Sequence, residues 1–324
     1  MDESSILDLA GLATPMAIRV AATLGLVERT GTAEHLASET GTAVGPLACL
    51  LDHLVSVGVF TVDAETGHYR PTSLGAQIRE VGPLLDINAA GGRAELAFVE
   101  LLGTITTGRP AYAERYGRDF WSDVEADPEL RRSFDHLMTW RIEREAPQVA
   151  ERFDWSRFQD IVDVGGGDGT ILEAILRANS QARGRVLDLA PATAAATARF
   201  ADAGLGDRAG TVTGSFFDPL PAGSDAYLLS DILHDWDDDH AREILTACRR
   251  AAAPNGIVVV IELVRERGAD TATDLFMLMC YGGRERTIGE LAALGAECGL
   301  VVGGSRQVSD ERTAVEFRVA PGAG

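Results

Sequence analysis

The second half of the chain alternates between short apolar runs and longer segments in which apolar residues recur at helical spacing. The apolar runs are Asp160–Val164, Gly184–Leu187, Gly210–Val212, Ala226–Leu229 and Gly256–Ile261, and the helical segments between them include Thr170–Ala178, Ala192–Ala203 and His240–Ala253. This alternation is typical of βαβ units, so it predicts a doubly wound, Rossmann-like α/β sheet. A last alternating run, Thr313–Ala320, predicts a strand at the edge of that sheet.

The first half is mainly helical. Apolar residues recur at helical spacing over residues 4–29, and Thr32 is placed to cap the next helix. Pro46 suits the start of a helix over Leu47–Val57, which Gly58 ends. A hairpin follows over residues 59–70, and the order of two helices and a hairpin predicts a winged helix-turn-helix. Residues 81–150 are expected to be mostly helical, with loops at 91–92 and 107–110.

Charge opposes a role in DNA binding for this winged part. The helix that would enter the major groove, residues 45–58, contains no arginine and carries Asp52. The whole chain has 29 basic and 49 acidic residues and a net charge of −20. Nucleic acid and anionic membranes are therefore disfavoured as partners. These helices are expected to bury their apolar faces against a second subunit, or else within an ordinary helical subdomain of the chain.

Two residue counts exclude further classes. The chain contains no lysine, which excludes P-loop nucleotide hydrolases, pyridoxal-phosphate enzymes and protein kinases, since all of these use one. The four cysteines show neither the spacing of a zinc site nor a disulfide framework.

The acidic N-terminus lacks the basic region of a secretory signal, and the longest apolar runs are too short to span a bilayer. A cytoplasmic location is expected.

A glycine loop follows the first predicted strand of the sheet. Its spacing, Gly165-x-Gly167-x-Gly169, departs from the dinucleotide fingerprint, which places its third glycine where this chain has Thr170. Asp188 ends the next strand, and a carboxylate there can accept hydrogen bonds from both ribose hydroxyls. This combination favours an adenosine ligand without a pyrophosphate over NAD. A strand-end or capping role for Asp188 is the alternative.

One of the six histidines is placed for chemistry. His234 follows the strand over residues 226–230, so it lies at the carboxyl edge of the sheet beside the glycine loop. A neutral imidazole is the usual general base near pH 7. Glu262 ends the neighbouring strand and points to the same edge, whereas Asp235 is expected to point away and cap the next helix or hold its loop. The alternative for His234 is a structural histidine.

At this point the chain resembles a known family, the S-adenosylmethionine-dependent O-methyltransferases shared by plants and bacteria, which act on small aromatic molecules. The resemblance covers nearly the whole chain and rests on five blocks in the family's order: Asp163–Gly169, Asp188, Gly214–Pro221, Leu233–Asp238 and Gly282–Thr287. It implies a Rossmann-like methyltransferase sheet preceded by a winged-helix dimerisation domain. Bacterial members of this kind commonly tailor polyketide-derived aromatic rings.

The resemblance assigns the cofactor site. Gly165, Gly167 and neighbours would hold the methionine part of S-adenosylmethionine, and Asp188 would hold the ribose. The loop of Gly214, Ser215, Phe216 and Phe217 would flank the adenine. Asp163 is placed with this site, where it could orient loop amides. Many relatives have Asp in place of Ser215, and plant relatives have Lys in place of Ser230. Those two contacts must differ here.

The resemblance also assigns the reaction. His234 would be the general base, with Glu262 and Glu285 flanking it. Met277, Tyr281, Met138 and Arg141 are the candidates for the substrate pocket, and Arg141 could pair with a substrate carboxylate, although a surface arginine is the plainer interpretation. No cluster has metal-ligand spacing, so a metal-independent mechanism is expected.

Together these inferences predict an O-methyltransferase that methylates a hydroxyl of a small aromatic, polyketide-derived molecule and releases S-adenosylhomocysteine. The expected parts are a dimerisation domain (1–80), connecting helices that contribute to the substrate pocket (81–150) and a cofactor-binding catalytic domain (151–324). A homodimer is expected. The alternatives are an NAD(P)-dependent oxidoreductase and a winged-helix regulator with a cofactor-sensing domain.

Overall fold

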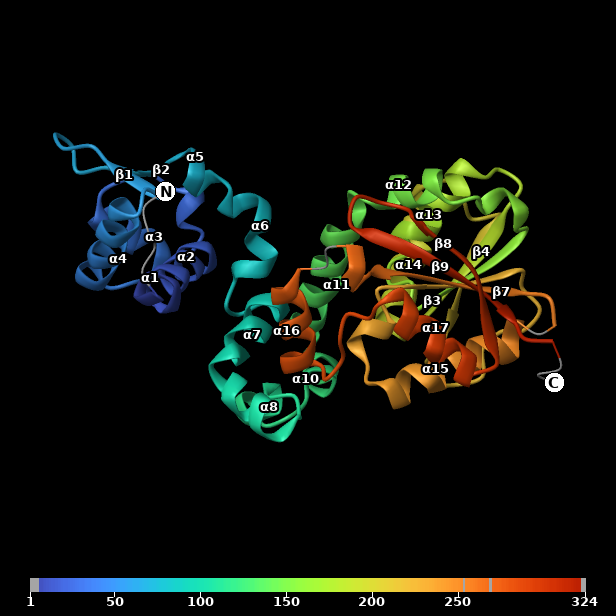
Figure 1. Cartoon of the computed structure of the whole chain (residues 1–324). Coiled ribbons are helices and arrows are strands. Elements are labelled where there is room, and N and C mark those ends of the chain that lie inside the picture. The colour runs from blue at the N-terminus through green and yellow to red at the C-terminus, as the bar shows by residue number, and fades with distance from the viewer. Residues whose placement is uncertain (1–5, 253, 268–269, 322–324) are drawn as a thin grey trace. The chain divides into compact units, whose positions relative to one another are not determined.

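A computed structural model describes residues 6–252, 254–267 and 270–321 of the chain. These residues form two compact units. The first unit comprises residues 1–96 and 124–137, and the second comprises residues 97–123 and 138–324 (Figure 1). The predicted connecting stretch, 81–150, thus contributes residues to both units. The roles predicted for the three parts of the chain stay predictions.

The second unit contains a seven-stranded sheet in the order β5-β4-β3-β6-β7-β9-β8. Its first five strands are parallel, and β9 runs antiparallel to both β7 and β8. The strands are β3 (Asp160–Val164), β4 (Arg183–Asp188), β5 (Ala209–Thr213), β6 (Ala226–Ser230), β7 (Ile257–Leu263), β8 (Leu300–Gln307) and β9 (Arg312–Val319). The predicted doubly wound sheet is confirmed.

The predicted position of the last strand is wrong. The run that was expected at the edge forms β9, which lies between β7 and β8. The edge strand is β8, whose residues after Leu300 are all exposed. Its sequence, LVVGGSRQ, contains two glycines and a break in register between Val302 and Gly304. A strand with these features has no alternating pattern, so no local pattern predicted it.

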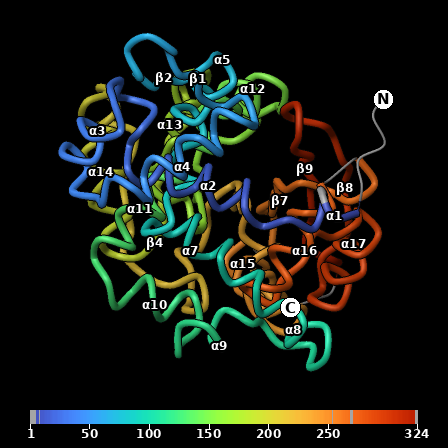
Figure 2. Tube along the Cα trace, turned by 90° about the vertical axis from the view of Figure 1, so that its left-hand side faces the viewer, coloured from blue at the N-terminus to red at the C-terminus, as the bar shows by residue number. Residues whose placement is uncertain are grey.

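Helices cover both faces of this sheet. On one face, α15 (Asp238–Ala252) and α17 (Ile288–Glu297) lie side by side and pack on Val162, Tyr227 and Val260 (Figures 1 and 2). On the other face, α12 (Ala146–Arg152), α13 (Thr170–Ala178) and α14 (Ala190–Asp202) pack on the alternate strand residues, such as Ile161 and Leu228. Because both faces are buried, the central strands are apolar throughout.

The predicted helices of the second unit agree with the structure to within a few residues. The helix over Thr170–Ala178 is found with the same bounds, while the other two begin earlier than expected, and Ala253 lies outside the described residues. The remaining helices are α8 (Leu101–Thr107), α9 (Tyr112–Tyr116), α10 (Phe120–Ala126), α11 (Pro128–Glu143) and α16 (Thr271–Cys280). Of these, α10 and α11 each have residues in both units.

The first unit has the expected winged-helix order. Thr32 caps α3, and its hydroxyl accepts a hydrogen bond from the His35 amide at 3.3 Å. Pro46 lies in the first turn of the next helix, and Gly58 follows that helix with φ +76°. The elements are α1 (Ile6–Ala10), α2 (Ala13–Thr23), α3 (Ala33–Thr40), α4 (Val44–Ser56), β1 (Phe60–Val62), β2 (Tyr69–Pro71), α5 (Ser73–Ala76), α6 (Ile78–Leu85) and α7 (Ala90–Leu96). Residues 4 and 5 of the predicted first helix lie outside the described residues.

The loop predicted at Gly91–Gly92 is wrong, because both residues lie within α7. A side chain at Gly92 would bring its Cβ within 2.1 Å of the Asp86 carbonyl oxygen. At Gly91 the corresponding distance to the Pro83 carbonyl oxygen is 3.0 Å. These glycines therefore allow a close approach between helices rather than a turn. In the described parts of the chain, no helix is both long enough and apolar enough to cross a membrane.

Candidate active site

The glycine loop connects β3 to α13 at the carboxyl edge of the sheet. Gly165, Gly167 and Gly169 have φ values of +72°, +59° and +80°, in the left-handed region that favours glycine. A Cβ on Gly165 would also lie 2.5 Å from the Cδ1 atom of Ile232. The loop is therefore closely packed against the segment that follows β6, and it leaves backbone exposed to a ligand on its open side.

Asp188 ends β4 and holds this loop. One oxygen of its carboxylate accepts a hydrogen bond from the Gly167 amide at 2.9 Å, and the other accepts one from the Leu189 amide at 2.6 Å. A carboxylate oxygen can accept more than one hydrogen bond, so this side chain is also suited to ligand hydroxyls. The Asp188 carbonyl oxygen accepts a hydrogen bond from the Gly214 amide at 3.0 Å, which brings the adenine-side loop to the same edge.

Asp163 lies beneath the loop and is 1% exposed. Neither carboxylate oxygen has a hydrogen-bond partner among the described residues, so the expectation that it orients loop amides is wrong. A Cβ on Gly166 would lie 2.4 Å from the Asp163 Cγ atom. Burial, followed by the charges of Asp188 and Asp168, raises the pKa of Asp163 to about 7. This carboxyl group is thus a buried acceptor with free capacity.

Aromatic rings surround the loop after β5. Phe216 and Phe217 both meet Trp236 edge to face, with ring centroids 5.9 and 5.0 Å apart. The Ser215 hydroxyl accepts a hydrogen bond from the Phe217 amide at 3.2 Å. The buried Ser230 hydroxyl, at the end of β6, has no hydrogen-bond partner in the described structure. The loop predicted to flank the adenine therefore packs against Trp236 through Phe216 and Phe217.

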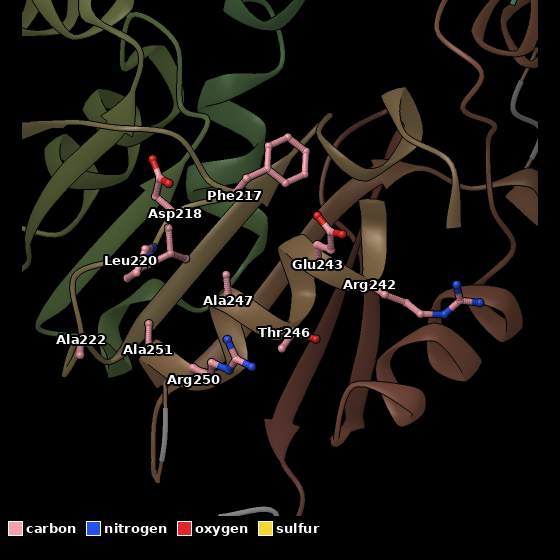
Figure 3. Close-up of a pocket in the computed structure, with 11 residues that line it drawn as sticks. Phe217, Asp218, Leu220, Ala222, Arg242, Glu243, Thr246, Ala247, Arg250 and Ala251 are labelled. Atoms are coloured by element: carbon pink, nitrogen blue, oxygen red, sulfur yellow. The ribbon is translucent and has the colours of Figure 1, made fainter. Parts of the chain in front are cut away.

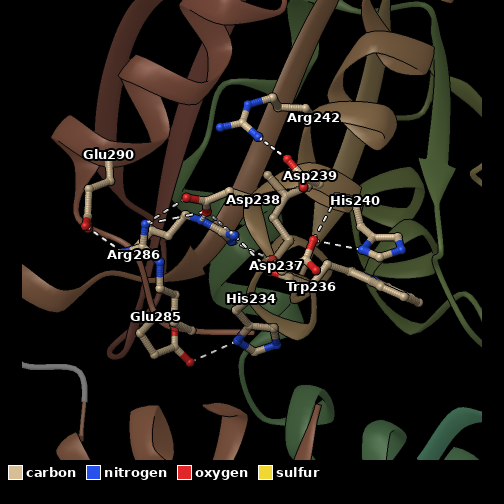
Figure 4. Close-up of polar contacts among 12 residues, drawn as sticks. His234, Trp236, Asp237, Asp238, Asp239, His240, Arg242, Glu285, Arg286 and Glu290 are labelled. Carbon is tan, nitrogen blue, oxygen red and sulfur yellow. Dashed lines mark hydrogen bonds and ion pairs between the residues drawn. The ribbon is translucent and has the colours of Figure 1, made fainter. Parts of the chain in front are cut away.

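His234 lies in a 3₁₀ turn, Leu233–Asp235, directly after β6 and is 3% exposed. Its Nδ1 atom lies 2.9 Å from Oε1 of Glu285 (Figure 4). An ionised carboxylate only accepts hydrogen bonds, so Nδ1 carries a hydrogen and Nε2 is the nitrogen that exchanges protons with a ligand. The structure thus brings together His234 and Glu285, two residues predicted from motifs far apart in the sequence.

Gly283 explains how these two motifs meet. A Cβ at this position would lie 1.9 Å from the carbonyl oxygen of His234, so only glycine lets the turn approach the histidine backbone. The Asp274 carboxylate accepts a hydrogen bond from the Glu285 amide at 3.0 Å and fixes the turn from α16. The glycine pair before Glu285 is therefore part of the geometry of the site.

Glu262 contacts the backbone of the histidine turn. Its Oε1 atom accepts hydrogen bonds from the amides of Leu233, at 2.6 Å, and His234, at 3.2 Å. No hydrogen bond joins Glu262 to the imidazole in the described structure. Glu262 therefore lies beside His234, as predicted, but it binds the main chain of the turn. Glu285 is the acid that binds the imidazole ring.

Asp235 was expected to point away from the histidine, and this expectation is wrong. Its Oδ1 atom lies 3.6 Å from Nε2 of His234. Burial raises the pKa of Asp235 to about 7, with the charge of Asp231 adding to this effect and the charges of His234 and Arg141 opposing it. A second carboxyl group therefore faces the imidazole on the side that a substrate must reach.

These acids determine the protonation of the base. Burial alone lowers the pKa of His234, but the charge of Asp235 and the hydrogen bond that Nδ1 donates to Glu285 outweigh it and raise the pKa to about 10. The surrounding carboxylates thus stabilise the protonated form of the imidazole. A site with so strongly perturbed a histidine, two motifs brought into contact and a nearby glycine loop is typical of an enzyme active site.

Sequence reasoning missed Arg286, which is fully buried. Its guanidinium donates hydrogen bonds to the carbonyl oxygens of Leu233, at 2.6 Å, and Trp236, at 2.8 Å, and to the Asp238 carboxylate (Figure 4). Its neighbour Arg284 pairs with Glu290 and Asp238.

The aromatic residues near the end of α16 include one that the sequence did not single out. Trp121, from α10, stacks on Trp236 with ring centroids 5.8 Å apart and on Tyr281 with centroids 5.3 Å apart. Met277 is buried and Tyr281 half-buried, as pocket candidates should be. Trp121 is distant in sequence from both partners, so no local pattern could identify it.

The model of the O-methyltransferase domain family matches residues 98–301. The chain belongs to this family. It is 47% identical over 311 residues to 2,7-dihydroxy-5-methyl-1-naphthoate 7-O-methyltransferase of Streptomyces carzinostaticus, with 93% of each chain covered. A solved O-methyltransferase from neocarzinostatin biosynthesis, in complex with S-adenosylmethionine and 2-hydroxy-5-methyl naphthoic acid, has a TM-score of 0.94 at 45% identity and covers 98% of this chain and 100% of its own.

The protein is accordingly an S-adenosylmethionine-dependent O-methyltransferase. Another relative, aclacinomycin 10-hydroxylase RdmB of Streptomyces purpurascens, is 41% identical, covering 96% of this chain and 88% of its own. The named relatives of this chain thus include an enzyme of a second reaction class.

The cofactor-side residues of this O-methyltransferase fit S-adenosylmethionine. The loop glycines offer close backbone approach, and Asp188 places a carboxylate beside the loop at the end of β4. The buried Asp163 carboxyl group can accept hydrogen bonds from an ammonium group. The Ser230 hydroxyl, which has no hydrogen-bond partner in the described structure, offers both a donor and an acceptor.

Met138 and Arg141, the other two pocket candidates, lie on α11 and are half-buried. Arg141 has no hydrogen-bond or ion-pair partner among the described residues, and its charge influences the pKa values of Asp231 and Asp235. The arginine therefore lies within electrostatic range of the base turn. Within the described ranges of the chain, no group of side chains has an arrangement suited to a metal ion.

A separate groove of about 590 Å³ lies between residues 217–222 and α15 (Figure 3). Arg242, Glu243, Thr246 and Arg250 line it along the helix, and Leu220 lines it from the loop. Phe217, from the loop predicted to flank the adenine, also lines this groove, whereas none of the residues predicted for the base or the substrate borders it.

Proposed function

We propose that this O-methyltransferase methylates a phenolic hydroxyl of a bicyclic hydroxyaromatic acid, with His234 as the general base. The observation that carries the proposal is the buried pair of His234 and Glu285, because it fixes one imidazole nitrogen and leaves the other for the acceptor. A phenol with a pKa of about 10 must lose its proton as it attacks, so a positioned base is required at neutral pH.

The proposed reaction assigns one task to each residue. S-adenosylmethionine, when bound, supplies the methyl group and leaves as S-adenosylhomocysteine. His234 accepts the hydroxyl proton at Nε2 while the acceptor oxygen forms its new bond to carbon. Glu285 stabilises the resulting imidazolium through Nδ1. Glu262 and Arg286 hold the amides and carbonyls of the turn, so that the imidazole meets the acceptor in one orientation.

The acid group of the acceptor is proposed from two sources. The relative of known structure binds 2-hydroxy-5-methyl naphthoic acid, and the relative from Streptomyces carzinostaticus acts on a dihydroxynaphthoate. In this chain, the half-buried Arg141 has no partner among the described side chains and could pair with such a carboxylate. Trp121, Tyr281 and Met277 supply the flat, apolar surface that a naphthalene ring requires.

We further propose that the enzyme works as a cytoplasmic homodimer whose first unit makes the interface. Four large apolar side chains at the N-terminal end of this unit, Ile6, Leu7, Leu9 and Leu12, are 67–77% exposed. So large a set on one short helix and its end favours burial against another chain. Residues 138–324 supply most of the catalytic unit.

Incubation of the enzyme with methyl-labelled cofactor and a panel of naphthols tests the substrate proposal. The panel pairs each hydroxynaphthoic acid with the naphthol that lacks its carboxylate. Label should appear on a phenolic oxygen, and kcat/KM should be at least about tenfold higher for the acids if Arg141 pairs with the carboxylate. Equal values for acids and naphthols would contradict the acid preference, and labelled carboxylate esters would contradict the acceptor group.

A further inference from the structure

Asp231 makes a backbone corner between β6 and the histidine turn. Its φ is +52°, and it is the one residue other than glycine with positive φ in the described ranges of the chain. An aspartate tolerates this conformation better than most residues, but it still needs external support to persist. The corner lies three residues before His234, so its geometry determines where the proposed base points.

A buried arginine from β9 supports this corner. Nε of Arg312 lies 3.0 Å from each carboxylate oxygen of Asp231, and Nη2 lies 2.6 Å from Oδ2. Arg312 is 1% exposed and also pairs with Glu145, which precedes α12, at 2.5 Å. The Ser309 hydroxyl donates to Glu145 and accepts a hydrogen bond from the Arg312 amide. The corner is therefore joined to two separate elements by one fixed guanidinium group.

The same segment contacts the cofactor loop and the base at successive residues. The Asp231 amide donates to the Ile261 carbonyl oxygen at 3.0 Å and anchors the segment to β7. Ile232 packs against Gly165, so closely that a Cβ there would lie 2.5 Å from its Cδ1 atom. His234 follows two residues later. A rotation at Asp231 would therefore move the imidazole relative to the glycine loop.

We propose that Arg312 and Asp231 are positioning residues for methyl transfer, which set the distance and orientation between the cofactor loop and the imidazole of His234. This inference rests on the proposed function of His234. Arg312 acts through Asp231 and touches neither the imidazole nor the glycine loop in the described contacts. The planar guanidinium of arginine suits this task, because it contacts both carboxylate oxygens of Asp231 and also reaches Glu145. A lysine ammonium lacks this fixed two-pronged geometry.

The test uses Asp231→Asn and Arg312→Lys in the full-length enzyme. Asparagine tolerates positive φ, so the backbone corner can persist in Asp231→Asn. Arg312 keeps Glu145 as its partner in that variant, so its buried charge stays paired. Arg318→Lys, on an exposed residue of the same strand, is the matched control. Each change is also made in a His234→Ala background. Turnover is compared at each variant's own optimum pH with an acidic phenol, and cofactor affinity is measured by calorimetry with S-adenosylhomocysteine.

With His234 present, we expect Asp231→Asn to lower kcat by about 10- to 100-fold, since misplacing reacting groups by about 1 Å costs that much. The KM and the S-adenosylhomocysteine affinity should change less than about threefold. In the His234→Ala background the same change should lower kcat by less than about twofold, because no base remains to be positioned. Arg312→Lys should follow the same pattern, and Arg318→Lys should change nothing.

Equal losses of kcat in the two backgrounds would overturn this inference alone, because the corner would then act on general stability. Unchanged kcat in Asp231→Asn with His234 present would also overturn it. Full turnover of His234→Ala by itself would overturn the proposed function, and this inference with it.

Discussion

The Nδ1 atom of His234 lies 2.9 Å from Oε1 of Glu285, and their side chains are 4% and 0% exposed. The contact joins the turn after β6 to the turn after α16. It fixes the tautomer of the imidazole and provides a negative charge beside the imidazolium that proton transfer creates. The proposed mechanism depends on this pair more than on any other contact.

Glu285→Gln should therefore lower kcat by about 10²-fold while S-adenosylhomocysteine affinity stays unchanged. The amide keeps the shape of the side chain but no longer stabilises a charged imidazole. Steady-state kinetics and calorimetry measure the two effects. Glu297→Gln, which changes the same charge at an exposed position of α17, is the control. Equal kcat values for the two variants would show that Glu285 is only a packing residue.

Asp188→Ala should weaken S-adenosylhomocysteine binding by roughly 1.5–3 kcal/mol, the usual loss of a hydrogen bond to a charged group. It also releases the Gly167 amide, which the carboxylate holds at 2.9 Å. Calorimetry measures the affinity, with the exposed Asp202→Ala as control. An unchanged dissociation constant would remove Asp188 from the cofactor site.

The rate should rise with pH between about 7 and 10. Because the pKa of His234 is raised to about 10, the neutral base becomes more abundant as pH increases toward that value. Asp235 is the strongest cause that raises this pKa, so Asp235→Asn should move the rise in kcat/KM to lower pH. Asp237→Asn, at an exposed residue that pairs with His240, should leave the profile in place. A shift to higher pH in Asp235→Asn would contradict this electrostatic assignment.

The proposed homodimer depends on the exposed apolar residues at the N-terminal end of the first unit. Changing Leu9 and Leu12, which are 75% and 67% exposed, to Asp together should yield a monomer in sedimentation velocity, because charged groups would replace the buried contact. Val301→Asp, on the exposed edge strand β8, is the control and should leave the assembly unchanged. A dimer that persists in the double variant would place the interface elsewhere.

Local pattern predicted the parts of the site that lie on regular elements. The apolar strands, the glycine loop and His234 follow from the βαβ alternation, since parallel strands bring their carboxyl ends to one edge. The contact between Glu285 and His234 could be predicted only from the resemblance to a family. It depends on the close approach of two chain segments at Gly283. Nothing in the spacing of the two motifs indicates that approach.

Contacts between distant elements could not be predicted. Asp235 is the last residue of the 3₁₀ turn Leu233–Asp235, and its contact with the imidazole is a tertiary detail without a local sequence signal. Arg312 comes from a strand whose place in the sheet the pattern assigned wrongly, so its contact with Asp231 had no local signal. Trp121 likewise reaches Trp236 only through tertiary packing.

The pH dependence of kcat in the enzyme and in His234→Ala, with one acidic and one weakly acidic phenol, tests the central claim most directly. We predict that the variant loses about 10²- to 10⁴-fold in kcat with the weak phenol and less with the acidic one, while S-adenosylhomocysteine affinity is retained. Its rate should follow the ionisation of each phenol, because water or hydroxide must then remove the proton. Near-normal kcat with both phenols would show that His234 is not the base.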